Sequence, residues 1–148
     1  MPRTSERSEA TGNFLTSIWE EVIVATINVK SQDFEAIISQ GGIVLVDFWA
    51  EWCGPCRAFA PVFEKLSQKY PEVVFAKVDT ESERDLAGAA AITSIPTLMV
   101  FRDGILLYRE AGALPEGALQ QLVEQVQALN MEEVRNHIAK ETGTTVEG

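Results

Sequence analysis

The segment 43–50 constrains the fold more than any other part of the chain, because Asp47 is its only polar residue. A nearly continuous apolar strand is typical of a sheet that helices cover on both faces, whereas a strand with one exposed face alternates apolar and polar residues. Segments 32–40 and 54–70, on either side, carry apolar residues at helical spacing. We therefore expect an α/β fold with 43–49 as a central strand.

The remaining segments continue the alternation of strands and helices. Strands are predicted at 22–29, 73–78, 97–101 and 105–109, and helices at 82–91 and from Pro115 onward. Asp103 and Gly104 are typical of a two-residue hairpin turn, Ser31 is the expected N-cap of the first helix, and Pro61 predicts a kink in the second. The order predicts a central mixed β-sheet flanked by helices on both faces.

Both cysteines of the chain, Cys53 and Cys56, follow the apolar strand directly. Two thiols at this spacing beside a strand–helix–strand pattern are typical of redox chemistry. The free N–H groups and the positive dipole end of the following helix favour an anion, so we expect a lowered pKa for the Cys53 thiol. Gly54 and Pro55 keep the turn tight. The predicted reaction is attack by Cys53 on a substrate disulfide, followed by resolution by Cys56, which is expected to be more buried.

Zinc binding, a structural role and inert packing are the alternatives for these cysteines. A zinc site needs four ligands, and the chain offers two cysteines and one histidine, His137. We therefore expect no metal site. A structural disulfide that closes so short a loop would restrict the unfolded chain little. Inert buried thiols are not favoured by the neighbouring Trp, Gly and Pro.

Asp47 is a second candidate for the site because it interrupts an otherwise apolar strand. Burying a carboxylate is costly, so its pKa should rise. A carboxyl group with a raised pKa can accept a proton when Cys56 attacks. Lys77, on the next predicted strand, is the obvious partner that would neutralise Asp47, and the two interpretations are compatible.

These features together resemble the thioredoxin family over about 25–129 of the sequence. A C-G-P-C motif that follows Asp and Trp, with I-P-T about forty residues later, is highly specific. Arg57 departs from the lysine that is common at its position. The residues that carry the resemblance lie in 46–56, 60–61, 78–79, 95–98, 101–104 and 112–113.

The resemblance implies a thioredoxin fold and a protein-disulfide reductase. It implies that Asp47 accepts the proton of Cys56 and that Pro96 forms a cis peptide bond with Ile95, whose backbone would pair with an extended substrate strand. The Gly-Pro pair between the cysteines implies a reductant rather than an oxidant. The apolar docking groove would comprise Trp52, Gly54, Pro55, Ile95, Gly112 and Ala113.

The resemblance also implies partners. No cofactor would be bound, and NADPH would supply electrons through thioredoxin reductase. Disulfide-containing substrates such as ribonucleotide reductase, peroxiredoxin and methionine sulfoxide reductase are implied. Two alternatives stay open: a dedicated reductant of a single partner, and a non-catalytic binding subunit that uses the fold as a platform. The intact dithiol, Asp47, Trp52 and Pro96 speak against the second.

The domain boundaries and bulk properties complete the expectations. We predict a flexible N-terminal extension at 1–21, a thioredoxin domain at 22–130 and a partly helical C-terminal extension at 131–148. A net charge of −10 argues against nucleic-acid binding. No stretch approaches the roughly 18 apolar residues of a membrane helix, and none resembles a signal peptide. A cytoplasmic monomer is therefore expected.

Overall fold

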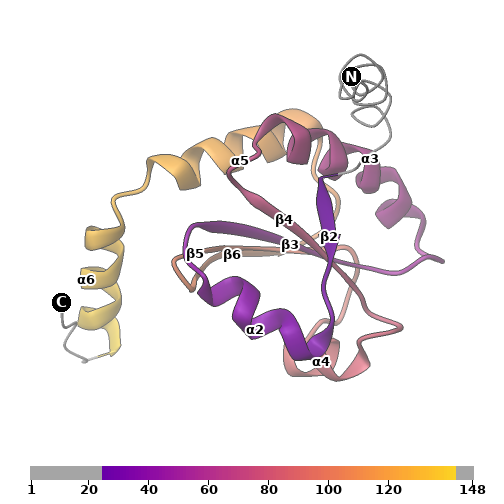
Figure 1. Ribbon diagram of the computed structural model, residues 1–148, viewed down its shortest axis with the longest axis horizontal. Helices are drawn as coiled ribbons and strands as arrows, with labels where there is room; N and C mark the ends of the chain where they lie inside the picture. Colours follow the sequence, from indigo (N-terminus) through magenta and orange to yellow (C-terminus); the bar gives the residue numbers. More distant parts are fainter. Residues whose placement is uncertain (1–24, 143–148) are drawn as a thin grey trace, which may run out of the picture.

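The computed structural model describes residues 25–142, so the predicted extension at 1–21 lies outside the described part. Its centre is a five-stranded sheet with the order β2-β4-β3-β5-β6, as Figure 1 shows. Strands β2, β4 and β3 are parallel, and β5 and β6 are each antiparallel to the preceding neighbour. The strands are β2 (Thr26–Asn28), β3 (Ile43–Trp49), β4 (Val74–Asp79), β5 (Thr97–Arg102) and β6 (Ile105–Ala111).

Helices cover both faces of this sheet, which confirms the predicted α/β architecture (Figure 1). Helices α2 and α4 pack on one face and α3 and α5 on the other, while α6 lies beyond the end of α5. The helices are α2 (Ser31–Ser39), α3 (Gly54–Lys69), α4 (Arg84–Ala89), α5 (Glu116–Ala128) and α6 (Met131–Thr142). None of the helices in this range is long and apolar enough to span a membrane.

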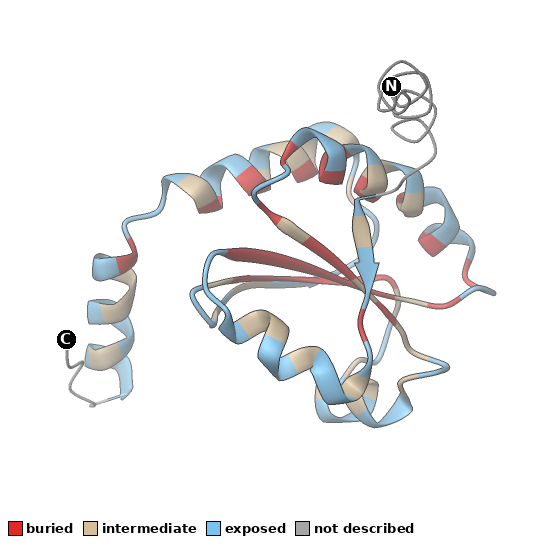
Figure 2. Cartoon of the chain, viewed as in Figure 1, coloured by how far each residue is buried: buried red, intermediate tan, exposed pale blue. Residues whose placement is uncertain are grey.

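The core consists of two layers, separated by the sheet. Successive residues of a strand point to opposite faces, so Leu45 packs with Phe63 of α3 while Val46 packs toward Phe34 of α2. Figure 2 shows the resulting band of buried residues along the central strands. By the same alternation, Asp47 points to the α3 side. The central strand is thus buried on both faces, as its composition predicts.

The predicted N-cap of the first helix is wrong by one residue. Lys30 is the N-cap of α2, and Ser31 is the first helical residue. Glu83, which precedes α4, accepts hydrogen bonds from the Ser31 N–H (2.8 Å) and hydroxyl (3.0 Å) at its Oε1 atom. A carboxylate from a distant segment therefore does the work that a local side-chain cap usually does.

The predicted hairpin turn between β5 and β6 is confirmed. Asp103 and Gly104 have φ angles of 55° and 81°, and a two-residue hairpin of this kind requires positive φ at both positions. The Asp103 carboxylate also accepts a hydrogen bond from the N–H of Gly42, at 3.0 Å. This turn lies at the end of the sheet away from the two cysteines.

Candidate functional site

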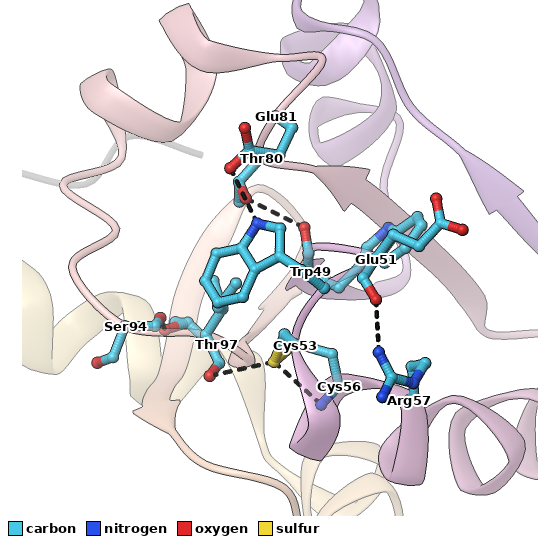
Figure 3. The surroundings of a disulfide bond; sticks show 11 residues. Trp49, Glu51, Cys53, Cys56, Arg57, Thr80, Glu81, Ser94 and Thr97 are labelled. Carbon is cyan, nitrogen blue, oxygen red and sulfur yellow. Dashed lines mark hydrogen bonds between the residues drawn. A yellow bond between two sulfur atoms is a disulfide. The ribbon is translucent and has the colours of Figure 1, made fainter.

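The two cysteines lie where β3 passes into α3. Cys53 is the N-cap of α3, and it forms a disulfide with Cys56, across a Cα–Cα distance of 5.2 Å. Figure 3 shows the backbone N–H of Cys56 directed at Cys53 Sγ, at 3.1 Å. Because this N–H group belongs to the first turn of a helix, it favours negative charge on that sulfur. Both side chains are buried, with 4% exposure for Cys53 and 2% for Cys56.

A second segment faces the disulfide from the start of β5. The peptide bond between Ile95 and Pro96 is cis, and the Ile95 carbonyl oxygen lies 3.7 Å from Cys53 Sγ. The Ile95 side chain packs against the cysteines and Ala50. The structure therefore brings Ile95 and Pro96 to the dithiol from a point about forty residues further along the chain.

Gly112 holds this segment by a backbone hydrogen bond. Its N–H donates a hydrogen bond to the Pro96 carbonyl oxygen at 2.8 Å. Its φ of 108° lies in the region where glycine is strongly favoured. Ala113 follows Gly112 and is exposed, as are Gly54 and Pro55 between the cysteines. Their contribution to a substrate groove stays a prediction.

Trp52 is the large exposed side chain beside the disulfide, with 67% of its surface accessible. Its indole N–H donates a hydrogen bond to the Glu81 carboxylate at 3.2 Å, and the same carboxylate pairs with Arg84 at 3.4 Å. Sequence reasoning missed Glu81. The available signal was its place just after β4, since parallel strands end at the same edge of a sheet. Trp52 lines a cavity of about 330 Å³ with Thr80, Ala87, Ile92, Thr93, Ser94 and Ile95.

Asp47 is fully buried on the α3 side of the sheet. Within the described residues, neither of its carboxylate oxygens has a hydrogen-bond partner. Burial raises the pKa of Asp47 from 3.8 to about 7, while the positive charge of Lys77 opposes part of this rise. Lys77 is the register neighbour of Asp47 on β4, and its ammonium lies 5.0 Å from the centroid of the Trp49 ring.

His137 lies far from this site, on α6, where its ring lies 3.7 Å from the Glu141 carboxylate. Across residues 25–142, no group of three or more His, Cys, Asp or Glu side chains is arranged to hold a metal ion. The chemistry of the site centres on the Cys53–Cys56 sulfur pair, with the buried Asp47 carboxyl group on the α3 side of the same sheet.

The geometry defines a class of protein. A cysteine pair that forms a disulfide at a helix N-terminus, next to an exposed apolar surface, can exchange that disulfide with one in another molecule. The fold and site are those of a thiol–disulfide oxidoreductase.

Comparisons with known proteins identify the family. The thioredoxin family model matches residues 25–125. A Streptomyces coelicolor relative whose name contains "thioredoxin 2" is 44% identical over 119 residues, which are 80% of this chain and 89% of the relative. The thioredoxin of Bacillus subtilis is 41% identical over 103 residues, which are 69% of this chain and 98% of the relative. The chain belongs to the thioredoxin family.

A solved structure agrees with this assignment. It was described in work on thiol resolution in a yeast mitochondrial 1-Cys peroxiredoxin via the glutathione and thioredoxin systems. It is 32% identical to this chain, with a TM-score of 0.63. The matched region covers 68% of this chain and 94% of the chain in the solved structure. The protein is thus a thiol–disulfide oxidoreductase that reduces protein disulfides through a reversible Cys53–Cys56 pair.

Proposed function

We propose that the protein is a general protein-disulfide reductase in which Cys53 attacks and Cys56 resolves. The observation that carries this assignment is the position of Cys53 Sγ, which accepts the Cys56 N–H at 3.1 Å and lies 3.7 Å from the Ile95 carbonyl oxygen. A thiolate there is stabilised by the helix N-terminus. It also lies beside the exposed Trp52, where a substrate can approach.

The electron flow balances in two steps. The Cys53 thiolate attacks one sulfur of the substrate disulfide, so that a mixed disulfide forms and the other substrate sulfur leaves as a thiolate. Cys56 then loses its proton and attacks Cys53 Sγ. The Cys53–Cys56 disulfide forms, and the second substrate sulfur leaves and is protonated. The substrate gains two electrons, and the dithiol loses two.

Asp47 is proposed as the acceptor of the Cys56 proton. A general base works best when its pKa is close to the working pH, and burial places the pKa of Asp47 at about 7. Lys77 is proposed as the partner that keeps this pKa from rising further. Asp47 and the side chains of α3, including Cys56, lie on the same side of the sheet, which supports a transfer directly or through water.

The proposed substrate site surrounds the dithiol. An extended substrate strand would pair with the backbone of Ile95, beside the cis peptide bond at Pro96. Its apolar side chains would contact Trp52 and the rim at Gly112 and Ala113. Gly54 and Pro55 are exposed between the cysteines, which supports close approach of a substrate disulfide to Cys53.

The proposed source of electrons is NADPH, through a thioredoxin reductase, without a cofactor bound to this chain. Ribonucleotide reductase, peroxiredoxin and methionine sulfoxide reductase are the proposed kinds of substrate, in a cytoplasmic electron-transport role performed by a monomer. Membership of the thioredoxin family supports the reductase and the disulfide-containing substrates. The related yeast structure concerns peroxiredoxin resolution, which supports that substrate in particular.

Insulin reduction, with dithiothreitol as the electron source, tests the reductase assignment. The parent protein should accelerate insulin precipitation, and Cys53→Ala should abolish the acceleration. Unchanged turnover in Cys53→Ala would contradict the assignment.

Cys56→Ser should accumulate mixed disulfides, whose identification by mass spectrometry names the partners. A single trapped protein would instead favour a dedicated reductant.

A single-turnover experiment tests the role of Asp47. Asp47→Asn should slow release of the mixed disulfide by about a hundredfold, the low end of the scale of general-base catalysis, and leave its formation less affected. Reduced protein is mixed with a disulfide substrate, quenched with acid and analysed by mass. Equal release rates in the variant and the parent would remove Asp47 from the mechanism.

A further inference from the structure

The segment 90–95 connects α4 to β5 and ends at Ile95, whose carbonyl oxygen faces Cys53 Sγ. We propose that Arg109, on β6, is a positioning residue that holds this segment in place for protein substrates. The proposal rests on the proposed function, because it concerns the wall on which a substrate strand would lie. Sequence reasoning gave Arg109 no role.

The helix α4 ends in a conformation that needs support. Ala91 N–H donates to the Gly88 carbonyl at 3.0 Å, and Ile92 N–H donates to the Ala87 carbonyl at 3.0 Å. These two bonds are typical of a helix end that closes with a left-handed residue, which is usually glycine. Here that residue is Ala91, with a φ of 56°, a conformation that a residue with a Cβ atom rarely adopts.

Arg109 supplies the support from the sheet. One guanidinium nitrogen donates to the Ala90 carbonyl oxygen at 2.7 Å, and a second donates to the Ala91 carbonyl oxygen at 2.8 Å. Two bonds from one planar group to successive carbonyls hold the chain in one orientation. The positive charge also suits the C-terminal end of a helix. Arg109 is the register neighbour of Met99 on β5, so the support comes from a rigid element.

The other end of the segment is held by Thr97, the first residue of β5, and by Gly112, which follows the end of β6. Thr97 Oγ1 donates to the Ser94 carbonyl oxygen at 2.6 Å, and Gly112 N–H donates to the Pro96 carbonyl oxygen at 2.8 Å. Thr93, between the two anchors, and Ser94, whose carbonyl oxygen belongs to the second anchor, are exposed and line the cavity beside Trp52. Arg109 therefore completes a pair of anchors that sets where Ile95 lies relative to Cys53.

Loss of Arg109 should affect large and small substrates differently. A protein disulfide that pairs with the backbone at Ile95 requires this wall in place and must order it if it is loose. A small aromatic disulfide needs only access to Cys53 Sγ. Loss of Arg109 should therefore slow the reaction with proteins and leave the reaction with small disulfides near its normal rate.

Arg109→Gln tests the proposal. The second-order rate constants for the reaction of the reduced protein with two disulfides are measured in this variant and in the parent. The rate constant with insulin should fall about fivefold, the scale of one lost ordering hydrogen bond, while that with dithiobis(nitrobenzoic acid) stays within about twofold. Arg109→Lys should recover part of the loss, because it keeps the charge but not the planar pair of donors. Amide hydrogen exchange at Thr93 and Ser94 should accelerate in Arg109→Gln.

Arg102→Gln is the matched control. Arg102 donates to the carbonyl oxygens of Val126 (2.8 Å) and Leu129 (3.2 Å) at the end of α5, at the other end of the sheet. This variant should lower the melting temperature without changing the ratio of the two rate constants. An unchanged ratio in Arg109→Gln, or an equal change in Arg102→Gln, would overturn the proposal. If the parent protein does not reduce insulin at all, the proposed function fails instead.

Discussion

Asp47 makes the free energy of unfolding of this protein depend on pH. Its carboxyl group is fully buried without a hydrogen-bond partner in the described structure. Its pKa is raised from 3.8 to about 7. The folded protein therefore holds this proton between about pH 4 and 7, whereas the unfolded chain has released it. The unfolded state binds fewer protons in that range, so stability falls as the pH rises, and it stays lower above pH 7.

We predict that Asp47→Ala raises the free energy of unfolding at pH 8. A shift of about three pKa units corresponds to about 4 kcal/mol at most, and loss of side-chain contacts reduces the gain to about 2 kcal/mol. At pH 4 the electrostatic gain is absent and only the loss of contacts remains, so the variant should be less stable than the parent by about 2 kcal/mol. Urea unfolding of the oxidised protein at both pH values measures the effect. Asp85→Asn, at an exposed position on α4, is the control and should behave alike at the two pH values. A parent protein equally stable at both would contradict the raised pKa.

At the scale of the element, the end of α4 combines local and distant interactions. The helix has only six residues, so little of its stability comes from its own hydrogen bonds. Leu86, Ala90 and Ile92 pack against the core on the α2 side of the sheet. The left-handed Ala91 is the weak point of this element, because its side chain makes that conformation costly.

We predict that Ala91→Gly stabilises the protein by about 0.5–1 kcal/mol, because glycine adopts positive φ without a steric cost. Part of the gain is offset by the greater freedom of glycine in the unfolded chain. Ala118→Gly, inside α5, is the same chemical change in a regular helix and should destabilise by about 1 kcal/mol. Thermal unfolding compares the two variants. A loss of stability in both would show that Ala91 is not strained.

At the scale of the whole molecule, the dithiol and α6 lie at opposite ends of the sheet. Cys53 follows the end of β3 and faces the start of β5, whereas Arg102, the last residue of β5, contacts the chain just before α6. Figure 1 shows α6 on the left and the connection from β3 to α3 on the right. A groove of about 380 Å³ separates α6 from β6, and it is lined by apolar residues that include Leu106, Leu129 and Ile138.

We predict that removal of 131–148 leaves the rate of insulin reduction unchanged within about twofold, because none of the proposed site residues lies in that segment. Stability should fall by about 1–3 kcal/mol, since Met131 is 7% exposed and its side chain would be lost from the core. Guanidinium unfolding and the insulin assay measure the two effects. A large loss of reductase activity in a folded truncated protein would instead assign α6 to substrate recognition.

The sequence allowed the fold and the centre of the site to be predicted because both follow local rules. The apolar strand, the helical spacing and the turn at Asp103 are each specified by adjacent residues, and the motif around Cys53 carries its chemistry with it. Contacts between distant side chains were not predictable. Glu83 replaces a local cap on α2, Glu81 holds Trp52, and Arg109 binds the end of α4. Apart from the position of Glu81 just after β4, nothing in the spacing of these residues indicates their partners, because the fold alone brings them together.

The position of α6 has a practical consequence. Because the reactive sulfur pair faces away from this helix, a linker fused after Thr142, the last residue of α6, starts from the end of the molecule opposite the dithiol. Protein immobilised through such a linker on a bead or an electrode should present its dithiol outward, in one orientation. The same arrangement would allow a partner domain to be fused after α6 without covering the sulfurs. The sheet thus acts as a spacer between an attachment point and a reaction point.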